Sequence, residues 1–203
     1  MKLVFQWIAI TVLVLTYLAA LLAVLHPHVS PGYRSYFIDH NSTDWNVVHY
    51  AGAPEQGMNF KRDGLPDWVT STVGLSVRDP MGRWTDRDVA RTPGILFARP
   101  FQGTVCVDLS VAPAPAMSGK EFGLRMGDKT ETLKLTKEGF SEFQIPFTLE
   151  RGSEKLELFL PDKLPRENEM DHSSTDTRRL GLLISTLRVV SGPCVGNGNV
   201  QRN

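Results

Sequence analysis

Hydrophobic and polar residues alternate with a period of two along much of the chain beyond residue 100. In the stretch 105–111, valine and leucine occupy the odd positions, and cysteine, aspartate and serine occupy the even ones. Successive side chains of a β-strand point to opposite faces, so this alternation predicts a strand with one buried and one exposed face. The same rhythm recurs in four further segments, at 122–126, 143–149, 156–160 and 180–190.

The alternation changes phase within the last of these segments. Leu182 and Ile184 share one phase, whereas Leu187 and Val189 share the other. A one-residue slip would turn the second pair away from the core, unless a β-bulge absorbs the extra residue. The sequence therefore predicts a bulge in this strand that keeps both pairs on the same face.

Glycine-containing turns separate these strands at Gly127-Asp128, at Gly139 and at 151–153. Their spacing of roughly 8–12 residues is typical of sandwiches and barrels. Outside the N-terminal segment, no stretch has hydrophobic residues at helical spacing. We therefore expect an all-β domain at 58–190, an antiparallel β-sandwich of jelly-roll type. The charged, aperiodic stretch 161–177 is predicted to be an exposed loop.

The N-terminal segment has a different character, because it is almost wholly apolar. From Leu3 to Leu25 the only strongly polar side chain is that of Gln6, and no side chain is charged. As a helix this run would reach about 34 Å, enough to cross a hydrocarbon core of about 30 Å. We therefore predict one transmembrane helix as an anchor at 1–26, with a secretory signal peptide as the alternative.

The cations around this segment predict its orientation. Lys2 precedes the apolar run and Arg34 is the nearest cation after it, which favours a cytoplasmic N-terminus and an external domain. The lipid bilayer is then the first expected partner. In an oxidising compartment Cys106 and Cys194 would form a disulfide, and two unrelated buried thiols are the alternative.

Two segments flank the predicted sandwich. Residues 27–57 are rich in Pro, Gly, Asn and His, which predicts a stalk with room for one short strand near 45–50. Within it, Asn41-Ser42-Thr43 is a glycosylation sequon in a eukaryotic protein and an ordinary polar turn otherwise. The histidines and aspartates of the stalk match no standard spacing of a metal site. Residues 191–203 are expected to form a flexible C-terminal tail.

Composition and motifs exclude several classes of function. The chain has 22 Lys and Arg against 22 Asp and Glu, so it is not a nucleic-acid binder that relies on bulk positive charge. Two cysteines and five histidines exclude a disulfide-dense scaffold and a zinc array. The sequence contains no nucleophile elbow, P-loop, zinc-protease or dinucleotide-binding motif. We therefore expect no metal and no organic cofactor.

The stretch 78–88 is the richest in side chains suited to ligand recognition. An aromatic ring stacks on the C–H face of a sugar, a guanidinium donates forked hydrogen bonds, and a carboxylate accepts from hydroxyls. Arg83, Trp84 and Asp86 combine these groups, and we consider them candidate ligand-binding residues of a shallow site. The alternative is that Trp84 packs in the core or at a sheet edge and that the charges form a solvated surface.

Four short motifs lie between residues 58 and 190. In chain order they are Gly64-Leu65-Pro66-Asp67-Trp68-Val69, Gly74-Leu75-Ser76, Gly82-Arg83-Trp84-Thr85-Asp86 and Asp176-Thr177-Arg178-Arg179-Leu180-Gly181-Leu182. In order and approximate spacing they resemble the C-terminal periplasmic domain of the phosphoglycerol transferase I family. That family transfers phosphoglycerol to membrane-derived oligosaccharides, the osmoregulated periplasmic glucans. Its chemistry belongs to a separate metal-dependent domain, which these motifs do not include.

The resemblance implies a non-catalytic accessory module at the periplasmic face of a bacterial inner membrane. Such a module would contact periplasmic or lipid-linked glycan, or a membrane glycosyltransferase or phosphoglycerol transferase. A purely structural subunit of a multispanning transferase complex is a second possible function. A third, a glycan hydrolase, would need carboxylates such as Asp86, Asp88 and Glu121 to face each other across a cleft.

Overall fold

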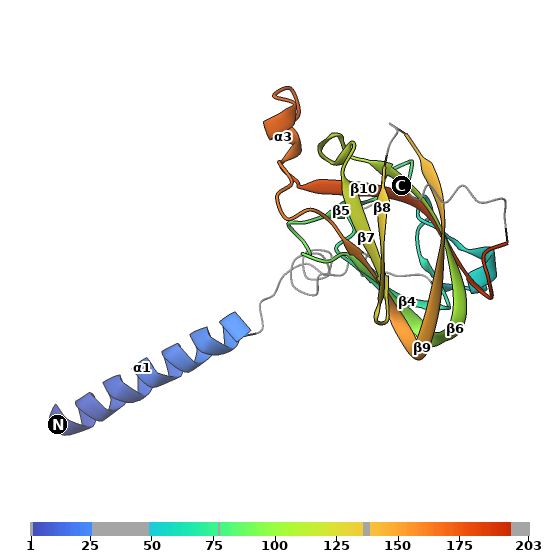
Figure 1. Cartoon of the computed structure of the whole chain (residues 1–203). Helices are drawn as coiled ribbons and strands as arrows, with labels where there is room; N and C mark the ends of the chain where they lie inside the picture. The colour runs from blue at the N-terminus through green and yellow to red at the C-terminus, as the bar shows by residue number, and fades with distance from the viewer. Residues whose placement is uncertain (1, 26–48, 77, 136–138, 196–203) are drawn as a thin grey trace.

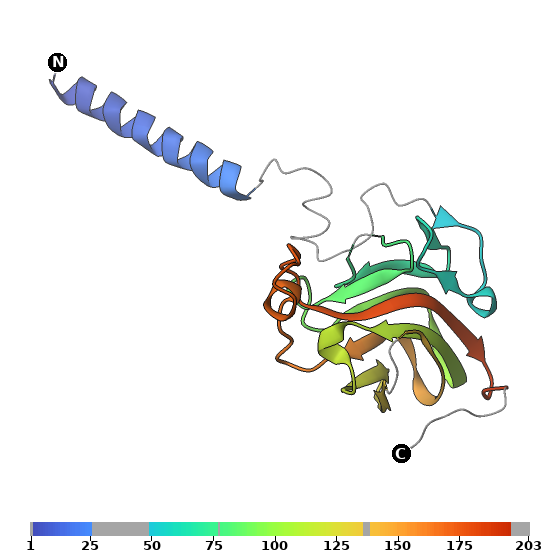
Figure 2. The ribbon, with the colours of Figure 1, turned by 90° about the horizontal axis from the view of Figure 1, so that it is seen from above.

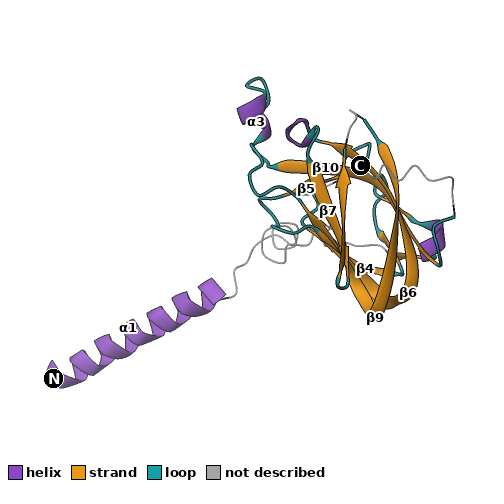
Figure 3. Ribbon diagram, viewed as in Figure 1, coloured by secondary structure: helices purple, strands orange, loops and turns teal. Residues whose placement is uncertain are grey.

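The computed structural model describes residues 2–25, 49–76, 78–135 and 139–195. Over these ranges the chain is mostly β-strand (Figure 1, Figure 3). The strands are β1 (His49–Tyr50), β2 (Met58–Asn59), β3 (Leu65–Pro66), β4 (Val69–Val73), β5 (Arg83–Asp86), β6 (Gly94–Pro113), β7 (Glu121–Met126), β8 (Lys129–Lys134), β9 (Ser141–Phe159) and β10 (Leu180–Ser191). The helices are α1 (Lys2–Leu25) and α3 (Glu167–Met170), with 3-10 turns η2 (Pro54–Gln56) and η3 (Pro115–Met117).

Eight of the strands form one antiparallel sheet. Its order is β2-β10-β6-β9-β7-β8, with β4 beside β6 and β5 beside β10. The long strands β6 and β9 take part in both halves of this sheet. In one half, the first part of β6 pairs with β4 and with the end of β9. In the other half, the second part of β6 pairs with β10 and with the start of β9. The sheet therefore folds over itself around one core (Figure 2). The prediction of a mostly β, antiparallel domain is confirmed.

The predicted alternation fills this core. The odd positions of 105–111 are at most 1% exposed. In β10 the side chains of Leu182, Ile184, Leu187 and Val189 are all fully buried, and the register against β6 shifts between Ile184 and Thr186. The predicted bulge is therefore confirmed. Its consequence is that the residues alternating with Leu187 and Val189 face away from the core.

Three segments differ from the sequence prediction. Residues 151–153 lie within β9 instead of forming a turn between two strands, because register shifts against β6 absorb the bend. The predicted loop 161–177 contains α3, and Leu164 in it is only 4% exposed. Residues 49–57, predicted as stalk, join the β domain, since β1 pairs with β3 and η2 lies against β10.

The N-terminal segment forms the helix α1, as the sequence predicts. Among the described residues, however, no helix combines the length and hydropathy that crossing a membrane requires. The predicted transmembrane anchor is therefore not confirmed. The remainder of the predicted stalk at 27–48, with its sequon, and the tail residues 196–203 lie outside the described residues, as does the last residue of the predicted anchor.

Candidate functional site

Polar side chains of four adjacent strands share the face of the sheet that lies opposite the core. Directly paired residues of antiparallel strands project on the same side, so the strand register arranges these side chains in rows. One row is Asn59, Thr186, Ser110 and Glu142, on β2, β10, β6 and β9 in turn. The next row is Arg188, Asp108 and Gln144, on β10, β6 and β9.

A groove of about 490 Å³ lies over these rows. Its wall is the segment 56–59, which runs along β10. Gly57 permits this close approach: its φ is +79°, and a Cβ atom there would come within 2.9 Å of the Leu187 carbonyl oxygen. Any larger residue at this position would push the wall away from the floor of the groove.

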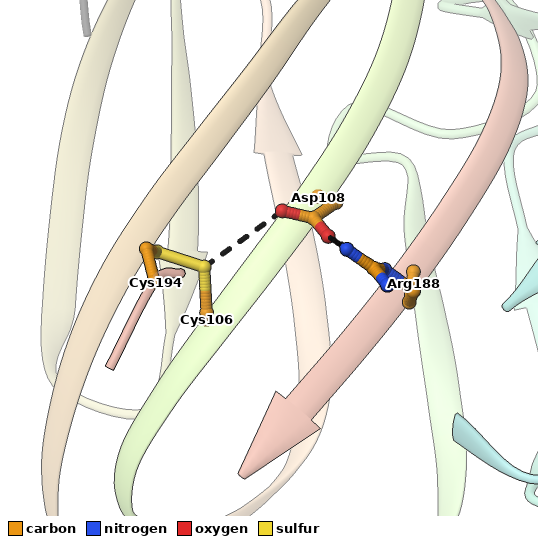
Figure 4. Close-up of a disulfide and its surroundings, with 4 residues drawn as sticks. All are labelled: Cys106, Asp108, Arg188 and Cys194. Atoms are coloured by element: carbon orange, nitrogen blue, oxygen red, sulfur yellow. Dashed lines mark hydrogen bonds and ion pairs between the residues drawn. A yellow bond between two sulfur atoms is a disulfide. The ribbon is translucent and has the colours of Figure 1, made fainter. Parts of the chain in front are cut away.

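An ion pair crosses the floor of the groove between β10 and β6. Arg188 donates from Nε to Asp108 Oδ2 at 2.6 Å, and its Nη2 contacts the same oxygen (Figure 4). The Asp108 side chain is 19% exposed and that of Arg188 is 48% exposed. A guanidinium carries five N–H donors, so Arg188 has donors beyond those given to Asp108. The pair therefore holds both groups in place while leaving them within reach of a ligand.

The other polar groups of the groove are also held in position. Ser110 Oγ donates to Glu142 Oε1 at 2.5 Å, and the backbone N–H of Lys61 donates to Asn59 Oδ1 at 2.9 Å. Carboxylates accept hydrogen bonds, a guanidinium donates them, and side-chain amides do both. With Gln144 added, the groove offers donors and acceptors side by side. This combination suits a ligand with many hydroxyl groups.

A disulfide joins Cys106 on β6 to Cys194, which follows β10, with Cα atoms 5.0 Å apart. Cys106 pairs with Val190 and Pro146, so the bridge lies one row beyond the row of Asp108. Cys106 Sγ is 3.8 Å from Asp108 Oδ1 (Figure 4). A disulfide sulfur carries no proton, so this is a packing contact rather than a hydrogen bond. The bridge thus bounds the polar face at one end.

The candidate ligand-binding residues predicted from the sequence lie outside the groove, on β5. Arg83 and Asp86 are 5% and 1% exposed, and Trp84 is half-buried. Arg83 Nη1 donates to the Ser76 carbonyl oxygen at 3.3 Å, and Asp86 Oδ1 accepts from the backbone N–H of Asp88 at 2.9 Å. The three side chains do not form an open site, because β5 pairs with β10 and turns its polar side chains into the protein.

Small residues in the motifs around β5 allow this strand to lie close to β10. A Cβ atom on Gly82 would lie 2.1 Å from the Ile184 carbonyl oxygen, and one on Gly181 would lie 2.7 Å from Thr85 Oγ1. The same hydroxyl oxygen accepts a hydrogen bond from the backbone N–H of Leu182 at 2.7 Å. These residues therefore have a structural role in the described part of the chain.

The carboxylates of the hydrolase alternative are not arranged for catalysis. Asp86 is buried, and Asp88 is paired with Arg179 at 2.8 Å and with Arg166 at 3.5 Å. Glu121 is the first residue of β7, in the other half of the sheet. These placements do not supply two open carboxylates that face each other. Within residues 49–195 as described, no group of three His, Cys, Asp or Glu side chains is close enough to hold a metal ion.

Sequence reasoning missed the groove, although a signal for it was present. Asp108, Gln144 and Arg188 are polar members of alternating strands, whose apolar members predict the core correctly. Alternation alone assigns such residues to solvent. Their gathering into one groove depends on the register of the strands and on the wall at 56–59, which carries no period.

Comparison with solved structures finds several similar chains, two of which are variants of one protein. Both are mutants of the carbohydrate-binding module CBM29-2, from studies of ligand recognition by family 29 carbohydrate-binding modules. The first is 10% identical, with a TM-score of 0.44, over 66% of this chain and 89% of that chain. The second is 12% identical, with a TM-score of 0.40, over 66% of this chain and 82% of that chain. At these values the likenesses support no conclusion about function.

The sequence comparisons are more specific. No curated protein matches the chain, and the resemblance to phosphoglycerol transferases is not confirmed. Residues 45–191 match a family described as a domain of unknown function, DUF7024. The match begins close to β1 and ends with β10, so it takes in the whole sheet and the groove. Because it covers most of the chain, the protein belongs to the DUF7024 family.

Proposed function

We propose that this protein is a non-catalytic glycan-binding module and that its ligand lies in the groove on β2, β10, β6 and β9. The observation that carries the proposal is the Arg188–Asp108 pair, which presents a donor and an acceptor on the open face of a rigid sheet. Gln144, Glu142 and Asn59 extend this set around the pair. Sugar hydroxyls both donate and accept, so they match such a surface.

The charges of the groove favour a neutral glycan over a polyanionic one. Arg188 and Asp108 neutralise each other, which leaves Glu142 as the remaining charge among the lining residues. Among the lining residues, no surplus of cations offsets the repulsion between this carboxylate and an anionic sugar. Binding of a neutral glycan should change little between low and moderate salt, because no net attraction between charges is screened.

We further propose that the domain works outside the cytoplasm, in a bacterial envelope, close to a membrane enzyme that handles glycan. The Cys106–Cys194 disulfide supports this location, because such bridges persist in oxidising compartments. The apolar N-terminal sequence and the resemblance to a periplasmic domain support it as well. Alkylation of thiols during cell lysis tests the location: both cysteines should be protected, and two free thiols in the cell would contradict it.

Glycan binding is tested by comparing two arginine variants of the full chain on a glycan array. Arg188→Ala removes the pair in the groove. Arg125→Ala removes a matched pair with Glu157, at 2.8 Å, between β7 and β9 in the other half of the sheet. We expect Arg188→Ala to weaken binding about tenfold, as for a contact residue of a binding site, and Arg125→Ala to leave it unchanged.

The outcomes of this comparison separate the functions that the sequence allows. Equal effects of the two variants would show that the groove is not the site. Absence of any glycan signal from the wild-type chain, together with copurification of a membrane transferase, would favour the structural subunit instead.

A further inference from the structure

We infer that Phe140 is the aromatic platform on which a sugar ring stacks at one end of the groove, and that the ligand is a short stretch of neutral glycan. The inference rests on the proposed function and deepens it. Sugar recognition commonly combines hydrogen bonds to hydroxyls with an aromatic ring against the C–H face. The polar rows supply the first component, and Phe140 supplies the second.

Exposure distinguishes Phe140 from the other aromatic residues of the β domain. Its side chain is 40% exposed, and among the described residues 49–195 it is the one Phe, Tyr or Trp that is exposed rather than half-buried or buried. Phe143, three positions further on, is half-buried and packs edge to face with Phe122 at 5.8 Å. Phe140 belongs to neither the core nor the residues packed against it. Core packing therefore does not explain this ring.

The neighbours of Phe140 place it at the groove. It directly precedes β9, two residues before Glu142, and Lys61 Nζ lies 6.0 Å from its ring centroid. Lys61 in turn follows β2 and is hydrogen-bonded through its backbone to Asn59. Asn59 and Glu142 are the two ends of one polar row, so the contact between Lys61 and Phe140 links the outer strands of the four-stranded face. The ring therefore lies next to the row that forms this end of the groove, just beyond the residues that line it.

The groove is bounded at both ends, which limits the length of its ligand. The Cys106–Cys194 disulfide lies at the opposite end, one row beyond Asp108. Ser141 pairs with Val111, so Phe140 is level with Ala112 on β6. The distance along β6 from Cys106 to Ala112 is about 20 Å at roughly 3.4 Å per residue. A segment of a few sugar rings fits between these ends.

Lys61 leaves the ring available for stacking. A separation of 6.0 Å is at the outer limit of a cation–π contact, so the ammonium group holds the ring only weakly. A sugar ring that approaches Phe140 would place its hydroxyls toward Glu142, which lies on the same strand two residues further along. The next ring would then lie over Arg188, Asp108 and Gln144.

Calorimetric titration of the full chain tests the inference. The probes are neutral linear gluco-, manno- and xylo-oligosaccharides, from disaccharide to octasaccharide. We expect Phe140→Ala to weaken binding about 5- to 30-fold, as for loss of a stacked anchor residue, with an unchanged unfolding midpoint. Phe140→Trp should retain binding and report it through a change in indole fluorescence. Met81→Ala removes another exposed apolar side chain, on the turn before β5, and should have no effect.

Each result supports or overturns a separate statement. Wild-type affinity in Phe140→Ala would overturn the stacking role and leave the proposed function intact. Affinity that keeps rising up to the octasaccharide would overturn the bounded groove. Failure of the wild-type chain to bind any of the three series would overturn both the inference and the proposed function for neutral glycans.

Discussion

Arg83 and Arg188 show at the residue scale how surroundings decide what a side chain does. The side chain of Arg83 is 6% exposed, donates to a backbone carbonyl and holds β5 in the interior. That of Arg188 is 48% exposed and forms its pair on an open face. A half-exposed ion pair contributes only about 0–1 kcal/mol to stability. The Arg188 pair therefore matters for the position of its groups more than for the stability of the fold.

Gly82 and Gly103 form a matched pair for testing the structural role of the β5 motif. Both have positive φ, but a Cβ atom on Gly82 would lie 2.1 Å from the Ile184 carbonyl oxygen, whereas one on Gly103 would meet nothing within 4 Å. We expect Gly82→Ala to lower the free energy of unfolding by more than about 3 kcal/mol, because the added methyl group would push β5 away from β10. Gly103→Ala should cost about 1 kcal/mol, from backbone strain alone.

Urea denaturation of the two alanine variants measures this difference. Equal losses of stability would show that the close approach of β5 and β10 does not contribute to the stability of the fold. The fold would then tolerate rearrangement at this position, and the conformation of the backbone alone would explain both glycines.

At the scale of elements, the bulge in β10 links the core to the groove. It keeps Leu187 and Val189 in the core after the change of phase, and it thereby directs Thr186 and Arg188 to the polar face. The extra residue, Ser185, is buried, and its carbonyl oxygen accepts from the backbone N–H of Phe60 at 2.9 Å. The bulge thus also fixes the chain that leaves β2 beside the groove.

The disulfide fixes the other end of the groove and encloses a large part of the β domain. It joins residues 88 positions apart. We expect Cys194→Ser to lower the free energy of unfolding by about 2–4 kcal/mol, because the unfolded chain gains freedom when the loop opens. Thermal unfolding under non-reducing conditions measures the change. Treatment of the wild-type chain with reductant should reproduce it, and an unchanged midpoint in both cases would contradict a structural role for the bridge.

The sequence predicts the strands that have one apolar and one polar face, and it misses those that do not. The period of 105–111 and the phase change in 180–190 identify parts of β6 and β10 correctly. Strand β8 is missed because its side chains are exposed or half-exposed on both faces. Strand β5 is missed because its polar side chains are buried, which reverses the usual relation between polarity and exposure. In both strands, the exposure of the side chains depends on how the strand pairs with its neighbours and not on its local sequence pattern.

The candidate site was less predictable than the fold for a related reason. Residue types in the β5 motif matched a sugar site, but their burial depends on the pairing of β5 with β10. The groove residues come from four strands that are distant in the chain. Phe140 lies outside the alternating pattern, because it comes before the first residue of β9. Neither feature is visible before the register of the strands is known.

At the scale of the whole molecule, one partly exposed ionic cluster around the half-buried Glu157 makes stability depend on pH. Burial would raise the pKa of Glu157, but hydrogen bonds and charges from Lys155 and Arg125 outweigh it and hold the pKa below its ordinary value of 4.5. The Lys155 contact is 2.6 Å and the Arg125 contact is 2.8 Å. A carboxyl with a lower pKa in the folded state stabilises the fold above its unfolded pKa. This stabilisation is lost as the pH falls below about 4.5 toward the folded pKa.

Glu157→Gln should therefore reduce stability at neutral pH and flatten its decline in acid. Melting temperatures measured from neutral pH to about pH 3 would show the wild-type and variant curves converging as the carboxyl protonates. Glu150→Gln changes an exposed residue of the same strand and serves as the control. Parallel curves for Glu157→Gln and the wild type would contradict a stabilising role for the cluster.

The position of a bound glycan on the protein tests directly whether the groove is the binding site. Backbone amide resonances of the full chain are followed by NMR as a neutral oligosaccharide is added. We expect the largest shifts at 106–110, 140–144 and 186–190, on adjacent strands around the groove. Shifts centred instead on β5 and the motif glycines, or no shifts with any neutral oligosaccharide, would contradict this expectation.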